Sequence, residues 1–200
     1  MSDTHLVLHG LAIKKNGTPE AIADLMGLDA GDVRAVLASL VETQRVVEVQ
    51  GKYLLAPLAR LALDADYARR YGALRADPVF AAGYEGFERI NGTLKQVITD
   101  WQTIAVGGER VLNPHADEDY DGKIIDRLGA LHERAEGILA GLAGVLPRLE
   151  VYRDKLTGAL EKAEDGDIAW VSDARIESYH TLWFELHEDL LRLMGRERED

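Results

Sequence analysis

Several polar side chains in the second half of the sequence lie on otherwise apolar helical faces. Asn91 is the single polar member of a stripe whose residues are spaced three and four apart, and His180 and His187 share one face of the last predicted helix. Buried polar groups need hydrogen-bond partners. They either bond one another, lie at the surface, or line a small-molecule pocket between helices. The residues assigned to this pocket are Asn91, Trp101, His115, His180 and His187.

Acidic residues between positions 117 and 121 resemble the opening of a calcium-binding loop. Asp117, Asp119 and Asp121 alternate and are followed by Gly122, as such a loop requires. Position twelve, however, would be Leu128 instead of the bidentate Glu. The acids equally suit the N-terminus of a helix, where they oppose its dipole. We therefore assign no calcium site.

Four histidines are candidate ligands for a zinc or iron site. His115, His132, His180 and His187 are residues of the right type. The sequence contains no HExxH motif, and His180 and His187 lie about 10 Å apart along a helix, too far for one metal. It also has no nucleophile elbow, phosphate-binding glycine loop or dinucleotide fingerprint. We predict no catalytic residue, metal or cofactor, and an enzyme is the third interpretation.

The composition limits the class of protein. The 200 residues contain no cysteine, which excludes disulfides, thiolate zinc sites and a cysteine nucleophile. The N-terminus lacks a signal-peptide pattern, and no apolar run approaches the roughly 20 residues that span a bilayer. We expect a cytoplasmic protein with no membrane partner.

Charge is distributed unevenly along the chain. The net charge is -12, which by itself disfavours binding to phosphates. Residues 1–75 contain nine Lys and Arg and nine Asp and Glu, whereas residues 76–200 contain 14 basic and 26 acidic residues. The sequence therefore predicts a neutral module joined to an acidic one.

The first part of the chain predicts three short helices followed by a hairpin. Apolar residues recur at helical spacing over 6–13, and Thr18 and Asp29 are expected to cap helices over 19–26 and 29–43. Two β-branched or aromatic runs, 45–49 and 52–55, flank the turn Gln50–Gly51. A fourth helix begins at Pro57.

Longer apolar stripes follow the dipeptide Asp77–Pro78. They predict helices over 78–101, 124–145, 152–163 and 173–193, with a loop over 107–121. Four antiparallel helices, or a close variant, would bury these stripes. The predicted fold is mainly α, with domains over 1–76 and 77–195 and a polar tail over 196–200. We expect the first 75 residues to fold alone.

Residues 18–57, TPEAIADLMGLDAGDVRAVLASLVETQRVVEVQGKYLLAP, resemble the winged helix-turn-helix of the MarR type. The resemblance implies that the 29–43 helix lies in a DNA major groove and that the hairpin is a wing beside the phosphates. The tip of the longer MarR-type wing usually carries Asp and Arg, which are absent here. The implied DNA-binding residues are Arg34, Ala35, Ala38, Ser39, Arg45 and Lys52.

The acidic part resembles a C-terminal domain of many uncharacterised actinobacterial proteins that carry the same kind of N-terminal domain. The matching segments are FERINGTLKQVITDWQ, NPHADEDYDGKI and ESYHTLWFELHEDLL. Such proteins are often labelled transcription regulators. The resemblance implies an architecture and transfers no catalytic residue.

The resulting hypothesis is a DNA-binding transcription regulator that forms a homodimer. Double-stranded DNA is the expected partner of the N-terminal domain, and the helical domain would sense a small-molecule effector or mediate dimerisation. The alternative is a non-enzymatic adaptor that uses its winged helix to contact a protein partner. The alternative is supported by the negative net charge of the chain. It is also supported by the three acids of the 29–43 helix, Asp29, Asp32 and Glu42.

Overall fold

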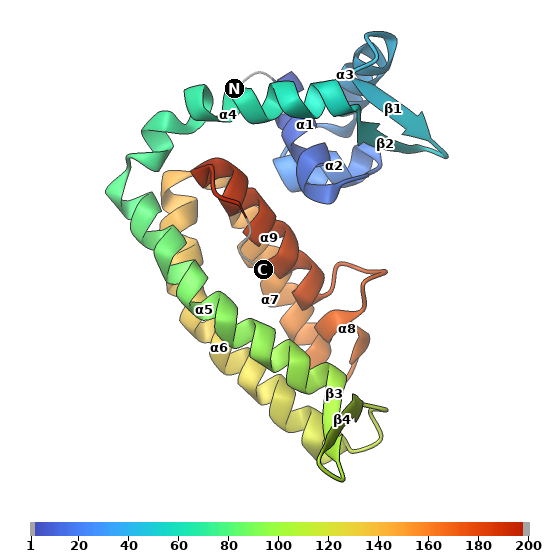
Figure 1. The fold of residues 1–200 in the computed structure, drawn as a ribbon, viewed down its shortest axis with the longest axis vertical. Coiled ribbons are helices and arrows are strands. Elements are labelled where there is room, and N and C mark those ends of the chain that lie inside the picture. Colours follow the sequence, from blue (N-terminus) through green and yellow to red (C-terminus); the bar gives the residue numbers. More distant parts are fainter. Residues whose placement is uncertain (1–2, 198–200) are drawn as a thin grey trace. The chain divides into compact units, whose positions relative to one another are not determined.

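A computed structural model describes residues 3–197 of the chain, and these residues are mainly helical. The described residues form two compact units, 3–77 with 185–197, and 78–184. Figure 1 shows the elements of each unit. In the described part of the chain, no helix combines the length and the apolar character needed to cross a bilayer.

The first unit begins with three helices and a hairpin, in the predicted order. They are α1 (Asp3–Lys14), α2 (Pro19–Met26), α3 (Ala30–Glu42), β1 (Val46–Val49) and β2 (Lys52–Leu55). Helix α4 (Pro57–Arg75) follows, and the unit is completed by the part of α9 (Tyr179–Met194) that starts at Glu185.

Local sequence signals account for the ends of these elements. The Thr18 side chain accepts a hydrogen bond from the Ala21 amide, and Asp29 accepts from the amides of Gly31 and Asp32, so both predicted caps are confirmed. Gln50 and Gly51, with φ of 53° and 75°, form the turn between β1 and β2. Paired positive φ angles match the twist of a two-residue hairpin.

The second unit is built on a long helical pair. Helices α5 (Pro78–Gln102) and α6 (Glu118–Val145) lie side by side (Figure 1). Cβ atoms added at Gly83 and Gly86 would lie 2.8 Å from Leu142 Cδ2 and 3.2 Å from Ile138 Cδ1, so the absent side chains allow this close approach. The remaining elements are η1 (Pro147–Leu149), α7 (Glu150–Glu164), α8 (Ala169–Ser172) and the first six residues of α9.

The predicted loop over 107–121 is wrong in its first and last parts, because residues 109–112 form a strand and helix α6 already begins at Glu118. Strands β3 (Thr103–Val106) and β4 (Glu109–Leu112) form an antiparallel hairpin with Gly107 and Gly108 at the turn. Both glycines have positive φ, which a two-residue hairpin turn requires. The last helix also starts at Tyr179 and not near 173, because Asp173 binds the amide and guanidinium of Arg175 in a local turn.

The units differ from the predicted domains at the C-terminal end of the chain. Residues 185–197 belong with the N-terminal elements and not with the helical pair. Within the predicted tail, residues 198–200 lie outside the described residues.

Candidate functional site

Helix α3 presents one exposed face that carries the predicted DNA-binding residues. Val33, Leu37 and Leu40 are buried in the first unit. This orientation turns the opposite face outward, and the four residues predicted there, Arg34, Ala35, Ala38 and Ser39, are all exposed. Three of these side chains are small, so the helix backbone can approach a flat or grooved partner closely.

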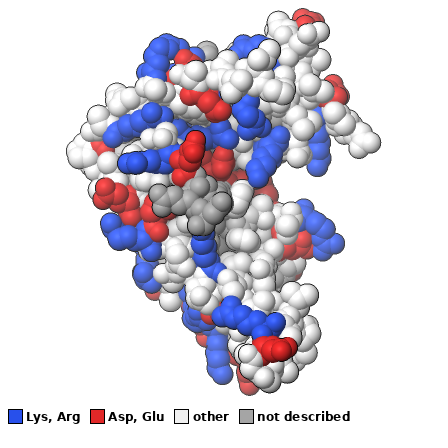
Figure 2. Space-filling model, in the orientation of Figure 1, with Lys and Arg blue, Asp and Glu red and all other residues white. Residues whose placement is uncertain are grey.

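The single cation of this face is already paired. Arg34 Nη2 lies 2.5 Å from Glu20 Oε1, and the side chains are 56% and 58% exposed. A backbone hydrogen bond of Glu20 and the Arg34 guanidinium hold the pKa of the Glu20 carboxyl below its ordinary value. On the face shown in Figure 2, basic and acidic side chains lie among one another. An exposed ion pair is readily opened, so Arg34 remains available to a strongly anionic partner.

The β1–β2 hairpin adds two cations and an apolar surface. Arg45 and Lys52, both predicted to bind DNA, are exposed. Val47 is 50% exposed and Val49 is 53% exposed. A hairpin with this surface can approach phosphates through its cations or a protein through its valines.

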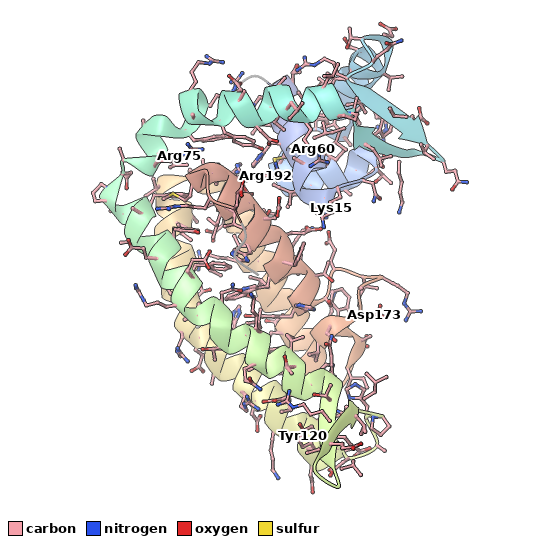
Figure 3. All side chains as sticks on the ribbon, viewed as in Figure 1. Lys15, Arg60, Arg75, Tyr120, Asp173 and Arg192 are labelled. Atoms are coloured by element: carbon pink, nitrogen blue, oxygen red, sulfur yellow. The ribbon has the colours of Figure 1, made fainter. Side chains whose placement is uncertain are left out.

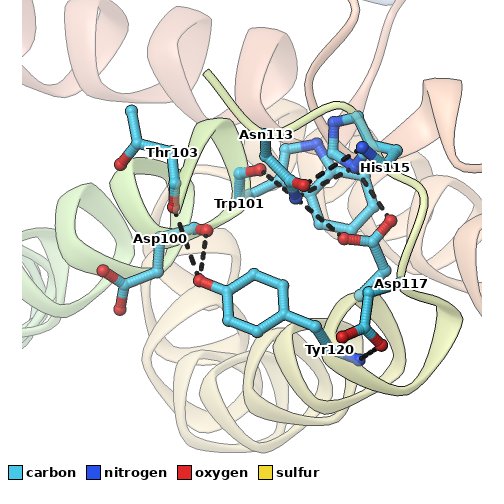
Figure 4. A network of polar contacts seen from close by, with 8 residues as sticks. Asp100, Trp101, Thr103, Asn113, His115, Asp117 and Tyr120 are labelled. Carbon is cyan, nitrogen blue, oxygen red and sulfur yellow. Dashed lines mark hydrogen bonds and ion pairs between the residues drawn. The ribbon is translucent and has the colours of Figure 1, made fainter. Parts of the chain in front are cut away.

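Of the five predicted pocket residues, Trp101 and His115 are brought together in the second unit. Their ring centroids are 4.4 Å apart. His115 Nδ1 lies 2.9 Å from Asp121 Oδ2, and the Asn113 amide donates to Trp101 O and to Asp121 Oδ1 (Figure 4). These bonds join the end of α5 to the segment that leads into α6.

The network fixes the proton position on His115. Asp121 is buried and its carboxylate only accepts, so Nδ1–H of His115 donates to it. The other ring nitrogen, Nε2, has no hydrogen-bond partner among residues 3–197. His115 also has a φ of 54°, a left-handed conformation that costs energy for a residue other than glycine.

Asn91 is satisfied by a hydrogen bond within the core of the second unit. Its side-chain oxygen accepts from Trp183 Nε1 at 3.0 Å, and Trp183 stacks on Phe87 with ring centroids 4.7 Å apart. The bond explains how a polar residue interrupts an apolar stripe. Its partner, Trp183, is not one of the five predicted pocket residues.

The remaining two pocket candidates lie in different units. His180 is half-buried in the second unit, whereas His187 is buried in the first. The described contacts therefore join Trp101 to His115 and Asn91 to Trp183.

The acids of the calcium-like segment have structural partners. Asp117 caps α6 by accepting from the Tyr120 amide, and Asp121 holds His115. Tyr120 in turn donates to Asp100 O. Among the described residues, no group of three or more His, Cys, Asp or Glu is arranged to hold a metal ion.

Two histidines give the second unit an expected pH dependence. Burial lowers the pKa of His132 and of His180 below the ordinary value of 6.5. Because the unfolded chain takes up protons first, the unit should lose stability as the pH falls below about 6.5. We expect the melting temperature of the double variant His132→Gln, His180→Gln to fall less between about pH 7 and pH 5 than that of the unchanged chain. An identical loss in both proteins would contradict this assignment.

A buried polar cluster in the first unit was missed by the sequence analysis. His9 Nε2 donates to Asp189 Oδ1 at 2.9 Å, and both side chains are fully buried. With Nε2 protonated, the neutral ring accepts at Nδ1 from the hydroxyl of Tyr67, 2.5 Å away. Burial raises the pKa of Tyr67, so its hydroxyl keeps the proton.

The same cluster continues along α1. His5 Nε2 lies 3.0 Å from the Tyr71 hydroxyl, and Lys14 Nζ lies 2.9 Å from Glu185 Oε1. The Lys14 and Glu185 side chains are only 9% and 12% exposed. These bonds connect α4 and the part of α9 that starts at Glu185 to α1. The sequence signal for this cluster was the four-residue spacing of His5 and His9 and of Tyr67 and Tyr71. Residues four apart lie on the same face of a helix.

The chain matches no protein-family model, no curated protein and no solved structure.

Proposed function

We propose that the chain is a DNA-binding transcription regulator whose first unit is a winged helix-turn-helix. The observation that carries the proposal is the exposed face of α3, with Arg34 beside the small residues Ala35, Ala38 and Ser39. A major groove about 12 Å wide admits an α-helix, and small side chains allow it to lie deep. Helices α2 and α3 are joined by a short turn at Gly27, and the β1–β2 hairpin follows α3 directly in the sequence, which supports the proposal.

In this proposal the functional protein is a homodimer. Two copies would place their α3 helices in successive major grooves, about 34 Å apart. Leu58 and Leu61 of α4 are 80% and 66% exposed, which supports contact between copies along this helix. A ligand that favours one packing would change the spacing of the two helices and so the affinity for an operator.

The Arg34–Glu20 pair provides the test of the proposal. Arg34→Ala should weaken binding to a selected DNA duplex at least about fivefold. Glu20→Gln should strengthen it, because the change removes a negative charge 2.5 Å from Arg34 and releases the guanidinium. The dissociation constants are measured by fluorescence anisotropy at one fixed salt concentration.

Two further variants complete the experiment. Arg175→Ala is the control for Arg34→Ala, because it removes the same charge from a side chain that is 88% exposed in the second unit. It should leave the DNA affinity unchanged. Lys52→Ala should weaken binding to all duplexes and reduce the salt slope by about one. Unchanged affinity in both Arg34→Ala and Lys52→Ala would refute the proposal.

The second candidate function is a protein-binding adaptor. The exposed valines of β1 favour it, as do the acids Asp29, Asp32 and Glu42 on α3, which repel a phosphate backbone. An adaptor would bind no DNA at low salt, and Val47→Asp with Val49→Asp would abolish its contact with the partner protein. The DNA titration above separates the two functions.

A further inference from the structure

The first unit contains a hollow of about 540 Å³ between α4 and the end of α9. This volume lies within the range of about 300 to 1,000 Å³ that is typical of small-molecule sites. Its polar lining consists of Tyr67, the three acids Asp64, Glu188 and Glu197, and the three arginines Arg75, Arg192 and Arg196. Figure 3 labels Arg75 at the end of α4 and Arg192 on α9.

Most acidic groups of the hollow are already bound. Arg192 Nη1 lies 3.1 Å from Asp64 Oδ1, and Nη2 lies 2.7 Å from Glu188 Oε1. These contacts use the carboxylates and both terminal amino groups of Arg192. A ligand that enters the hollow therefore meets few carboxylates able to hold a cation; the remaining one is the exposed Glu197.

Hydrogen-bond donors, in contrast, remain available. Arg192 Nε is buried and has no hydrogen-bond partner among the described residues. Arg75 donates from Nε to Leu193 O and from Nη2 to Arg192 O, which leaves its Nη1 uncommitted among residues 3–197. Arg196 lines the hollow and has no ion pair in that part of the chain.

We propose that this hollow binds a small organic anion that carries a phosphate or a carboxylate group. Guanidinium groups bind both kinds of oxyanion through paired, charge-assisted hydrogen bonds. Arg75 and Arg196 line the hollow without a carboxylate partner among the described residues, and this favours an anion over a neutral or cationic ligand. The bound anion would bridge α4 and the end of α9.

Such an anion is placed to act on the buried cluster of the first unit. Tyr67 lines the hollow and its hydroxyl bonds His9, which in turn bonds Asp189 of α9. The anion would thus stabilise the attachment of α9 to α1 and α4. The role of this anion as an effector rests on the proposed DNA-binding function. The binding of the anion to the hollow does not depend on that function.

Isothermal titration calorimetry of the full chain tests the site without DNA. The probes are glucose 6-phosphate, citrate and, as the uncharged control, glucose. We expect saturable heat with at least one of the two anions and none with glucose. The response to glucose 6-phosphate or to citrate identifies the phosphate or the carboxylate as the recognised group.

Arg196→Ala locates the binding event. Arg196 is exposed, so its removal should leave the melting temperature unchanged while the anion binds at least about fivefold more weakly. Arg175→Ala, with the same charge change in the second unit, should bind as the unchanged chain does. Absence of heat with both anions, or equal affinity in Arg196→Ala, would overturn the proposal. Loss of DNA binding alone would not affect these results.

Discussion

Asp189→Ala is expected to destabilise the first unit by about 1 to 3 kcal/mol. The substitution removes the acceptor of His9 Nε2–H at a place where both side chains are fully buried. A buried donor that loses a charged partner cannot turn to water. Native-state hydrogen exchange of the α1 amides measures the effect in this unit alone.

Two matched variants show whether the effect comes from the pair. Asp189→Asn keeps an oxygen near His9 and should cost less than Asp189→Ala. Asp126→Ala makes the same change at an exposed position of α6 and should alter stability by less than about 0.5 kcal/mol. If the α1 amides of the Asp189→Ala variant exchanged as slowly as those of the unchanged chain, the His9–Asp189 hydrogen bond would not stabilise the unit.

The isolated fragment 1–77 is expected to melt at a much lower temperature than the full chain, or without a cooperative transition. It lacks Asp189 and Glu185, the partners of His9 and Lys14, and the carbonyl groups to which Arg75 donates. Unpaired buried polar groups of this kind are among the largest single sources of instability. Thermal melting followed by circular dichroism gives the comparison.

A synthetic peptide with residues 185–200 should restore structure to this fragment in a concentration-dependent manner. The same peptide with Ala at position 189 is the control and should restore less. A fragment that melts cooperatively at the temperature of the full chain would instead support the prediction made from the sequence, that the first 75 residues fold alone.

Local features of the fold were predictable because each depends on few neighbouring residues. Thr18 and Asp29 cap their helices, Pro57 and Pro78 begin helices, and Gln50 with Gly51 forms the hairpin turn. Capping and turn geometry are properties of segments about four residues long. The mainly α character follows from the helical spacing of the apolar residues.

The second hairpin was missed although its signal was present. Gly107 and Gly108 fit the start of a loop, which the sequence predicts there. Val106 and Val111 on either side of them, however, are β-branched. A pair of glycines between β-branched residues indicates a hairpin turn as well as a loop. Only the pairing of Thr103–Val106 with Glu109–Leu112 decides between them.

The polar clusters were not predictable because their members are distant in sequence. His9 and Asp189 are 180 residues apart, and Asn91 and Trp183 are 92 apart. The spacing of polar residues on one helix shows that a partner is needed. It does not show which other helix supplies that partner, because this depends on how the helices are rotated and packed.

Selection of bound duplexes from a random DNA library tests the central claim most directly. The full chain at low salt should enrich a recurrent sequence, and Arg34→Ala should enrich it less. If the chain is a homodimer, the sequence should contain two half-sites about 34 Å apart. Recovery of no sequence above the starting library by the unchanged chain would contradict the proposed DNA-binding function.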